Sequence, residues 1–151
     1  MSDHLHQINI SYVPVEDRLM MRINTKQGIE YRVWLIRRLT GLLTKEIYKH
    51  GGIPLLASTD QTRSLFKQGA MEKPYEAVDM PLGQTGILAY KINYKSNPDA
   101  SLALELLPEQ GKGVNMSLNK SLLFLFYNWL TQACAHTEWK LPEAGVSNTK
   151  H

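Results

Sequence analysis

The chain has 151 residues, of which 43% are hydrophobic and 21% are charged, as in an ordinary globular protein. The formal net charge of +3 is smaller than that of a dedicated nucleic-acid-binding protein. The single cysteine, Cys134, excludes an intramolecular disulfide. The N-terminus lacks the apolar run of a signal peptide, and no apolar stretch is long enough to span a bilayer. We therefore expect a cytoplasmic protein with no membrane contact.

The first fifty residues predict three strands and a helix. Apolar and polar residues alternate over 7–12, 18–23 and 29–35, which is the period of half-buried strands. From Leu35 the period changes to that of an amphipathic helix, which Gly51 and Gly52 should end.

The turn between the second and third strands sets their predicted register. Residues 24–28 form this turn, and Gly28 supplies the positive φ of a type I turn with a bulge. Ile23 should then pair with Ile29, and the next inward pairs are Met21 with Tyr31 and Leu19 with Val33. A shift of one residue would bury Arg22, so the inward face is well specified.

The region 86–136 repeats this order of elements. Alternating strands are expected over 88–95 and 102–106, a turn with Gly111 follows, and Val114 and Met116 line a third strand. A helix follows over about 118–134. The inner face of the first of these strands should consist of Leu88, Tyr90, Ile92 and Tyr94, with Ala89 on the outer face.

Identical residues align the two regions at an offset of 82 and, after one insertion, of 83. They are Ile10, Tyr12, Asp17, Leu19, Gln27, Gly28, Leu35, Leu39 and Leu42, which match Ile92, Tyr94, Asp99, Leu102, Gln110, Gly111, Leu118, Leu122 and Leu125. We infer an internal duplication, although two unrelated meanders would share some of this pattern. A linker over 51–85 with a short helix joins the units, and 142–151 form a disordered tail.

The predicted fold class is α+β. Internally duplicated β-β-β-α units, about 6–50 and 86–136, form one antiparallel sheet of about six strands with the two long helices on one face, related by a pseudo-twofold axis. The second helix is apolar nearly all round, so it belongs either to the monomer core or to a dimer interface.

The sequence contains no residue pattern that indicates a catalytic site or a metal site. His4, His6, His136 and His151 are too few and too dispersed for a metal site with supporting ligands. Cys134 stands near the C-terminal end of its helix, where nothing lowers its pKa, so a small buried residue is the better interpretation. The glycine turn at Gly111 lacks the phosphate-loop pattern. We predict no cofactor and no metal.

One surface is a candidate binding site, namely the outward face of the first unit. Arginines there accompany an outward tryptophan, as single-stranded nucleic acid or a protein partner would require. The candidate residues are Arg18, Met20, Arg22, Arg32, Trp34, Arg37 and Arg38. The simpler alternative is a solvated face whose Trp34 is covered by the linker, the tail or a partner subunit, because Glu30 interrupts the patch.

Two resemblances accompany this interpretation. The runs Tyr12–Leu19, Trp34–Leu39, Pro81–Gly83 and Glu138–Pro142 resemble a family of short proteobacterial proteins of unknown function. At the level of architecture, duplicated meander–helix units are similar to the whirly-type single-stranded-DNA-binding fold, whose repeats have four strands rather than the three found here. The first resemblance implies no activity, and the second implies binding of single-stranded DNA.

The function predicted from the sequence is therefore a non-catalytic binding or interaction module, with a homodimer as one option. The partner is a protein or a single-stranded nucleic acid, bound on the outer face of the first unit. The alternative is a small-molecule-binding protein or enzyme with a pocket between the two units, lined by Tyr12 and Tyr94 or by the linker near Tyr75.

Overall fold

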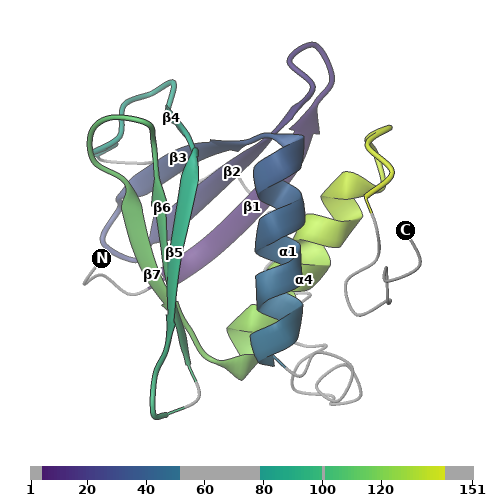
Figure 1. Cartoon of the computed structure of the whole chain (residues 1–151). Helices are drawn as coiled ribbons and strands as arrows, with labels where there is room; N and C mark the ends of the chain where they lie inside the picture. Colours follow the sequence, from purple (N-terminus) through teal and green to yellow (C-terminus); the bar gives the residue numbers. More distant parts are fainter. Residues whose placement is uncertain (1–4, 52–78, 100, 142–151) are drawn as a thin grey trace.

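The chain forms an α+β structure in which two sheets and two helices share one core (Figure 1). The computed structural model describes residues 5–51, 79–99 and 101–141. The predicted linker helix, Tyr75, His4, His151 and the tail lie outside these residues.

The first sheet has four strands in the order β1-β2-β3-β4. They are β1 (Leu5–Val13), β2 (Arg18–Thr25), β3 (Glu30–Leu35) and the short β4 (Ile87–Leu88). The pairs β1–β2 and β2–β3 are antiparallel, whereas β4 pairs with β3 in parallel. This sheet is therefore mixed, and the predicted all-antiparallel sheet is wrong at this edge.

The predicted register of β2 and β3 is wrong by two residues. Leu19 pairs with Leu35 and Met21 with Val33, because the hairpin loop has three residues rather than five. The Thr25 N–H donates to the carbonyl of Ile29 at 2.9 Å, which closes this loop. A shift of two leaves every side chain on its predicted face.

Gly28 ends this loop with a φ of +89°, as predicted. That left-handed conformation is what a glycine accepts without strain after a type I turn. Gly111 occupies the corresponding place in the second unit, with a φ of +102°.

The second sheet is separate, which corrects the prediction of one six-stranded sheet. It contains β5 (Lys91–Ser96), β6 (Leu102–Leu107) and β7 (Val114–Leu118), all antiparallel. The strand predicted over 88–95 is split between the sheets at residues 89 and 90. The Ala89 N–H donates to the carbonyl of Trp34 in the first sheet, and the Tyr90 N–H donates to that of Leu107 in the second.

This change of sheet overturns several predicted side-chain positions. Ala89 is fully buried rather than outward. Leu88, Tyr90 and Tyr94, expected on the inner face, are 42%, 55% and 48% exposed. Leu88 and Tyr94 lie on the edge strands β4 and β5, each of which has a neighbour on one side only, and Tyr90 lies between these two strands.

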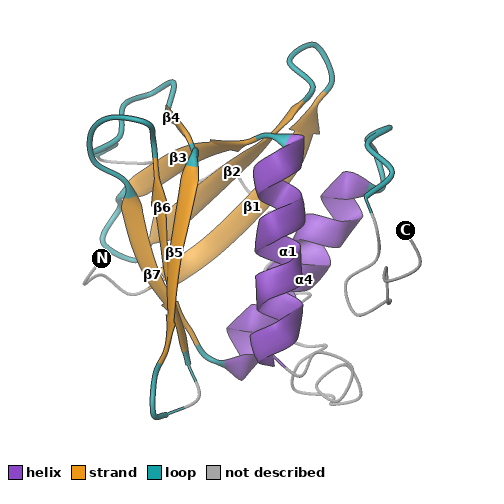
Figure 2. Cartoon of the chain, in the orientation of Figure 1, coloured by secondary structure: helices purple, strands orange, loops and turns teal. Residues whose placement is uncertain are grey.

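The helices cover the apolar faces of the sheets (Figure 2). Helix α1 (Arg37–Gly51) contacts β5, and α4 (Lys120–Cys134) contacts β1, β7 and α1. Asn119 caps α4 by accepting a hydrogen bond from the Leu122 N–H at 2.9 Å.

Helix α4 belongs to the core of the monomer, which confirms one of the two places predicted for it. Its buried residues are Leu123, Phe124, Leu125, Phe126, Leu130 and Ala133. They pack in one cluster with apolar side chains from both sheets and from α1. Among the described residues, no helix is long and apolar enough to cross a membrane.

Candidate functional site

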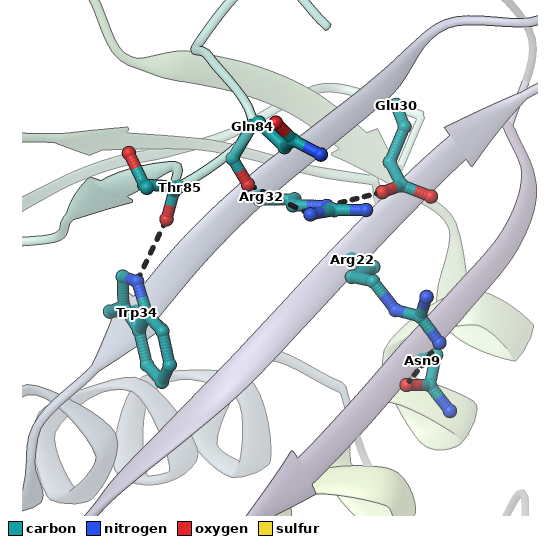
Figure 3. A network of polar contacts seen from close by, with 7 residues as sticks. All are labelled: Asn9, Arg22, Glu30, Arg32, Trp34, Gln84 and Thr85. Atoms are coloured by element: carbon teal, nitrogen blue, oxygen red, sulfur yellow. Dashed lines mark hydrogen bonds and ion pairs between the residues drawn. The ribbon is translucent and has the colours of Figure 1, made fainter. Parts of the chain in front are cut away.

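The outer face of β1, β2 and β3 carries most of the predicted site residues, and Figure 3 shows Arg22, Arg32 and Trp34 among them. The register places Met20 opposite Trp34 and Arg22 opposite Arg32. These are neighbouring pairs on the same face of the sheet. We call the surface formed by Ser11, Arg18, Met20, Arg22, Arg32 and Trp34 the outer face. The register predicted from the sequence implies that Arg18 lies opposite Trp34 and Met20 opposite Arg32, which is wrong because of the two-residue shift.

Arg18 and Trp34 nevertheless touch each other diagonally across the two strands. The guanidinium carbon of Arg18 lies 4.3 Å from the centroid of the indole ring, a cation–π contact. The same arginine forms an ion pair with Glu16. The indole N–H of Trp34 donates to the carbonyl of Thr85 at 2.9 Å (Figure 3). Trp34 is thus half-buried, held by Arg18 on its ring and by the segment before β4 at its edge.

Arg32 is also paired with a carboxylate. Its Nε donates to Glu30 Oε2 at 2.5 Å, and its Nη1 donates to the carbonyl of Gln84 at 2.8 Å. Glu30 is only 1% exposed, so its charge requires this partner. Arg22 reaches toward β1, where its Nη2 donates to Oδ1 of Asn9 at 3.4 Å (Figure 3).

The end of this surface next to the β2–β3 hairpin is closed. Asn24 pairs with Glu30 across the strands, and its side chain is fully buried. Among the residues that the structure describes, neither the nitrogen nor the oxygen of that side-chain amide has a hydrogen-bond partner. Accessible side chains therefore begin one row further on, at Arg22, and extend to Met20 and Ser11.

Arg37 and Arg38 do not join this surface. Arg37 borders a pocket with Tyr12 and Trp139, whose side chains pack against the core. Arg38 lies on α1 and donates from Nη2 to the carbonyl of Tyr90 at 3.0 Å. The prediction grouped them with the outer face because they follow β3 directly, but the helix turns them away from it.

The pocket at Arg37 has a volume of about 590 Å³, and Asp17 is among its lining residues. The hydroxyl of Tyr12 and the indole N–H of Trp139 both donate to Asp17 Oδ1, at 2.6 and 2.9 Å. The hydrogen bond to Asp17 raises the pKa of Tyr12. The hydrogen bonds from Tyr12 and then Trp139 lower the pKa of Asp17.

A second, shallower hollow of about 410 Å³ lies on the three-stranded sheet. Its lining includes Tyr94, Ala103 and Ser117. In these two hollows of the described residues, Tyr12 lines one and Tyr94 the other, whereas the small-molecule alternative predicts a pocket that they share. The prediction that Tyr75 lines such a pocket concerns a residue outside the described ranges.

Cys134 fits the predicted role of an inert residue. Desolvation by burial raises its pKa to about 11, which leaves the thiol protonated at neutral pH. Within residues 5–51, 79–99 and 101–141, no cluster of three His, Cys, Asp or Glu side chains could hold a metal ion.

Sequence reasoning missed the two ion pairs that neutralise arginines on the outer face. Both follow one pattern, a glutamate two residues before an arginine: Glu16 with Arg18 and Glu30 with Arg32. Glu30 and Arg32 both lie in β3, where residues i and i+2 share a face, so their spacing was an available signal. Glu16 lies in the turn before β2, where this rule does not apply. Asp17 and Trp139 were missed as partners because 122 residues separate them.

Comparisons of the chain with models of protein families, with curated proteins and with solved structures find no match. The two resemblances drawn from the sequence therefore stay predictions. The arrangement of side chains is what supports the proposals that follow.

Proposed function

We propose that the protein is a non-catalytic interaction module that binds a protein partner through its outer face. The observation that carries this proposal is the grouping of Trp34, Arg18, Met20 and Arg22 on one half-buried sheet surface. Tryptophan, arginine and methionine are the residue types enriched at protein–protein contacts. Strand β4 and the segment before it fix Trp34, so its ring is held in place before a partner arrives.

A protein suits this surface better than a nucleic acid does. Arg18 and Arg32 are each paired with a glutamate, so little net positive charge is left for phosphates. Arg18 also lies over the ring of Trp34, where a nucleobase would have to stack. We therefore place single-stranded nucleic acid second at this site, and a second copy of the chain remains one form of the protein partner.

The test is photo-crosslinking in cells of the native host. A benzophenone amino acid at Met20 should give ultraviolet-dependent adducts that resist nuclease, and an adduct of twice the chain mass would identify a homodimer. The matched control is the same amino acid at Ser117, which is exposed on the outer side of β7. Trp34→Ala should weaken capture at Met20 by about 30-fold, the effect of a typical hot-spot residue.

Three outcomes would overturn the proposal. They are no adduct at Met20, equal adducts at Met20 and Ser117, and adducts made only with nucleic acid.

We further propose that the two β-β-β-α units arose by duplication. An offset of 83 maps α1 onto α4 from end to end, and Gly28 onto Gly111. The same offset maps the pair Leu19–Leu35 onto Leu102–Leu118. Helix α4 contacts β1 while α1 contacts β5, a reciprocal arrangement that a pseudo-twofold axis would produce. The register of β1 and β2 departs from this mapping by two residues.

A small-molecule site is the second candidate function, supported by the pocket around Asp17. Arg37 and Glu138 both line it. It lies within the first unit and the segment after α4, rather than between the units.

A further inference from the structure

The pocket around Asp17 is formed by parts of the chain that are far apart in sequence. Tyr12 and Asp17 come from the β1–β2 hairpin, Arg37 from the start of α1, and Glu138 and Trp139 from the segment after α4. Figure 1 shows this last segment beside the hairpin. The pocket volume of about 590 Å³ lies within the range of about 300–1,000 Å³ that is typical of small-molecule sites.

The backbone at the pocket adopts a conformation that L-residues take only at a cost. Asp17 has a φ of +53°, and Lys140, which follows Trp139, has a φ of +54°. Among the described residues, these are the two that have a positive φ without being glycine. Such strain persists where surrounding contacts maintain it, and it is common at functional sites. The hydrogen bonds from Tyr12 and Trp139 to Oδ1 of Asp17 are contacts of this kind.

The carboxylate of Asp17 is held in place with one oxygen left for a ligand. Oδ1 accepts both hydrogen bonds, at 2.6 and 2.9 Å, whereas no described residue donates a hydrogen bond to Oδ2. A carboxylate that is already fixed loses little conformational freedom when a ligand binds. Asp17 can therefore accept a hydrogen bond from a ligand without giving up its own contacts.

The pocket also carries charges of both signs that do not pair with one another. Arg37 and Glu138 line it together with Asp17, and all three are exposed to solvent. Within the part of the chain that the structure describes, none of the three forms an ion pair. Arg37 nevertheless lies near enough to contribute to the lowered pKa of Asp17, after the larger effects of the hydrogen bonds from Tyr12 and Trp139. Opposite charges thus line one space without closing on each other.

Apolar side chains form the rest of the pocket wall. Ile36 and Tyr12 are half-buried, and Trp139 is only 5% exposed. The two rings meet edge to face, with their centroids 6.1 Å apart. A ligand that places its charged groups against the charged residues would therefore rest its uncharged part on an apolar surface.

We propose that the pocket around Asp17 binds a free α-amino acid with an apolar side chain, a proposal that rests on the small-molecule site named above as the second candidate function. The carboxylates of Asp17 and Glu138 accept hydrogen bonds from the ammonium group of the ligand, and the planar guanidinium of Arg37 suits its carboxylate. A simple amine would leave Arg37 without a partner. A simple carboxylic acid would be repelled by the two carboxylates of the pocket.

The test is an NMR titration of the full ¹⁵N-labelled chain with three compounds of similar shape. They are L-leucine, L-leucinamide, which lacks the carboxylate, and 4-methylpentanoate, which lacks the ammonium group. The reporter is the indole N–H of Trp139, because this group donates to Asp17 in the pocket. L-leucine should shift this signal saturably, and each analogue should bind about tenfold more weakly or worse, since each loses a set of charge-assisted hydrogen bonds.

Two variants separate the roles of the charged residues. Arg37→Gln should weaken the binding of L-leucine by about tenfold without weakening that of L-leucinamide. Glu138→Gln should weaken the binding of L-leucine without weakening that of 4-methylpentanoate. The matched charge controls are Lys112→Gln and Glu109→Gln, in the exposed turn between β6 and β7, and they should change neither affinity. The NMR spectrum of each variant shows whether it is folded.

Three results would overturn the proposal. They are no shift of the Trp139 signal with 20 mM L-leucine or L-phenylalanine, equal binding of L-leucine and either analogue, and equal weakening by the control variants. A fragment library screened on the same signal separates two kinds of failure. Fragment hits without amino-acid binding would keep the small-molecule site and reject this ligand, whereas no hit of any kind would reject both. None of these results bears on crosslinking at Met20.

Discussion

Gly86 is the position where the packing of β4 against β3 can be tested most directly. It has a φ of +80°, and a Cβ built there would lie 2.4 Å from the carbonyl oxygen of Arg32 and 2.8 Å from its Cβ. The contacting oxygen belongs to a backbone in the middle of a sheet, so it cannot move aside. Gly86→Ala should therefore either displace β3 or release the segment that holds Trp34.

Gly83 provides a matched control three residues earlier. Its φ of +87° imposes the same backbone strain on an alanine, yet nothing lies within 4 Å of the added Cβ. Left-handed strain in an L-residue costs about 1–2 kcal/mol, and we expect this for both variants. Overpacking adds about 1–3 kcal/mol, and we expect it for Gly86→Ala only.

The measurement is a urea unfolding curve that is monitored by tryptophan fluorescence. With an m-value of about 2 kcal/mol/M, the midpoint of Gly86→Ala should fall about 0.5–1.5 M below that of Gly83→Ala. Hydrogen exchange should also quicken at Ala89, whose N–H donates to Trp34 across β3 and β4. Equal midpoints for the two variants would refute the claim that close approach, rather than backbone conformation, requires glycine at position 86.

The remaining predictions concern titration. Tyr12 and Trp139 lower the pKa of Asp17, so the stability they confer is present above the unfolded carboxyl pKa of about 3.9 and is lost as pH falls through the folded pKa. Tyr12→Phe should therefore destabilise the protein more at pH 6 than at pH 3, as measured by urea unfolding, and an equal loss at both would contradict this. Because the pKa of Cys134 is about 11, its alkylation by iodoacetamide at pH 8 should be roughly 200-fold slower than that of a free thiol. A rate close to that of the urea-unfolded chain would show the thiol to be accessible and ionised.

The sequence predicted which face of each strand its side chains occupy, but it did not predict which residues pair between strands. Alternation over β2 and β3 predicted which side chains point inward, and Gly28 located the hairpin. Alternation has a period of two, so it cannot distinguish registers that differ by two residues, and only loop length decides. The two-residue error in pairing followed from that ambiguity.

No pattern in the sequence around residues 87–96 indicates that the strands divide into two sheets. Residues 87–96 read as one alternating strand, and its change of partner at Ala89 depends on β3 and β6, which are distant in sequence. For the same reason, the exposure of Tyr90 and Tyr94 and their meeting with α1 could not be predicted. The neutralised state of Arg32 was predictable from Glu30 at the same face of one strand.

The passage of the chain from β4 to β5 has a consequence for the order of folding. Strands β1–β3 and β5–β7 pair through short loops, whereas the β3–β4 pair closes a loop of roughly fifty residues, which carries a larger entropic penalty. Local hairpins form faster than such non-local pairs. We therefore expect the two meanders to form first and independently. The Ala89 and Tyr90 hydrogen bonds would then join them late, so the geometry around Trp34 would be among the last to be completed.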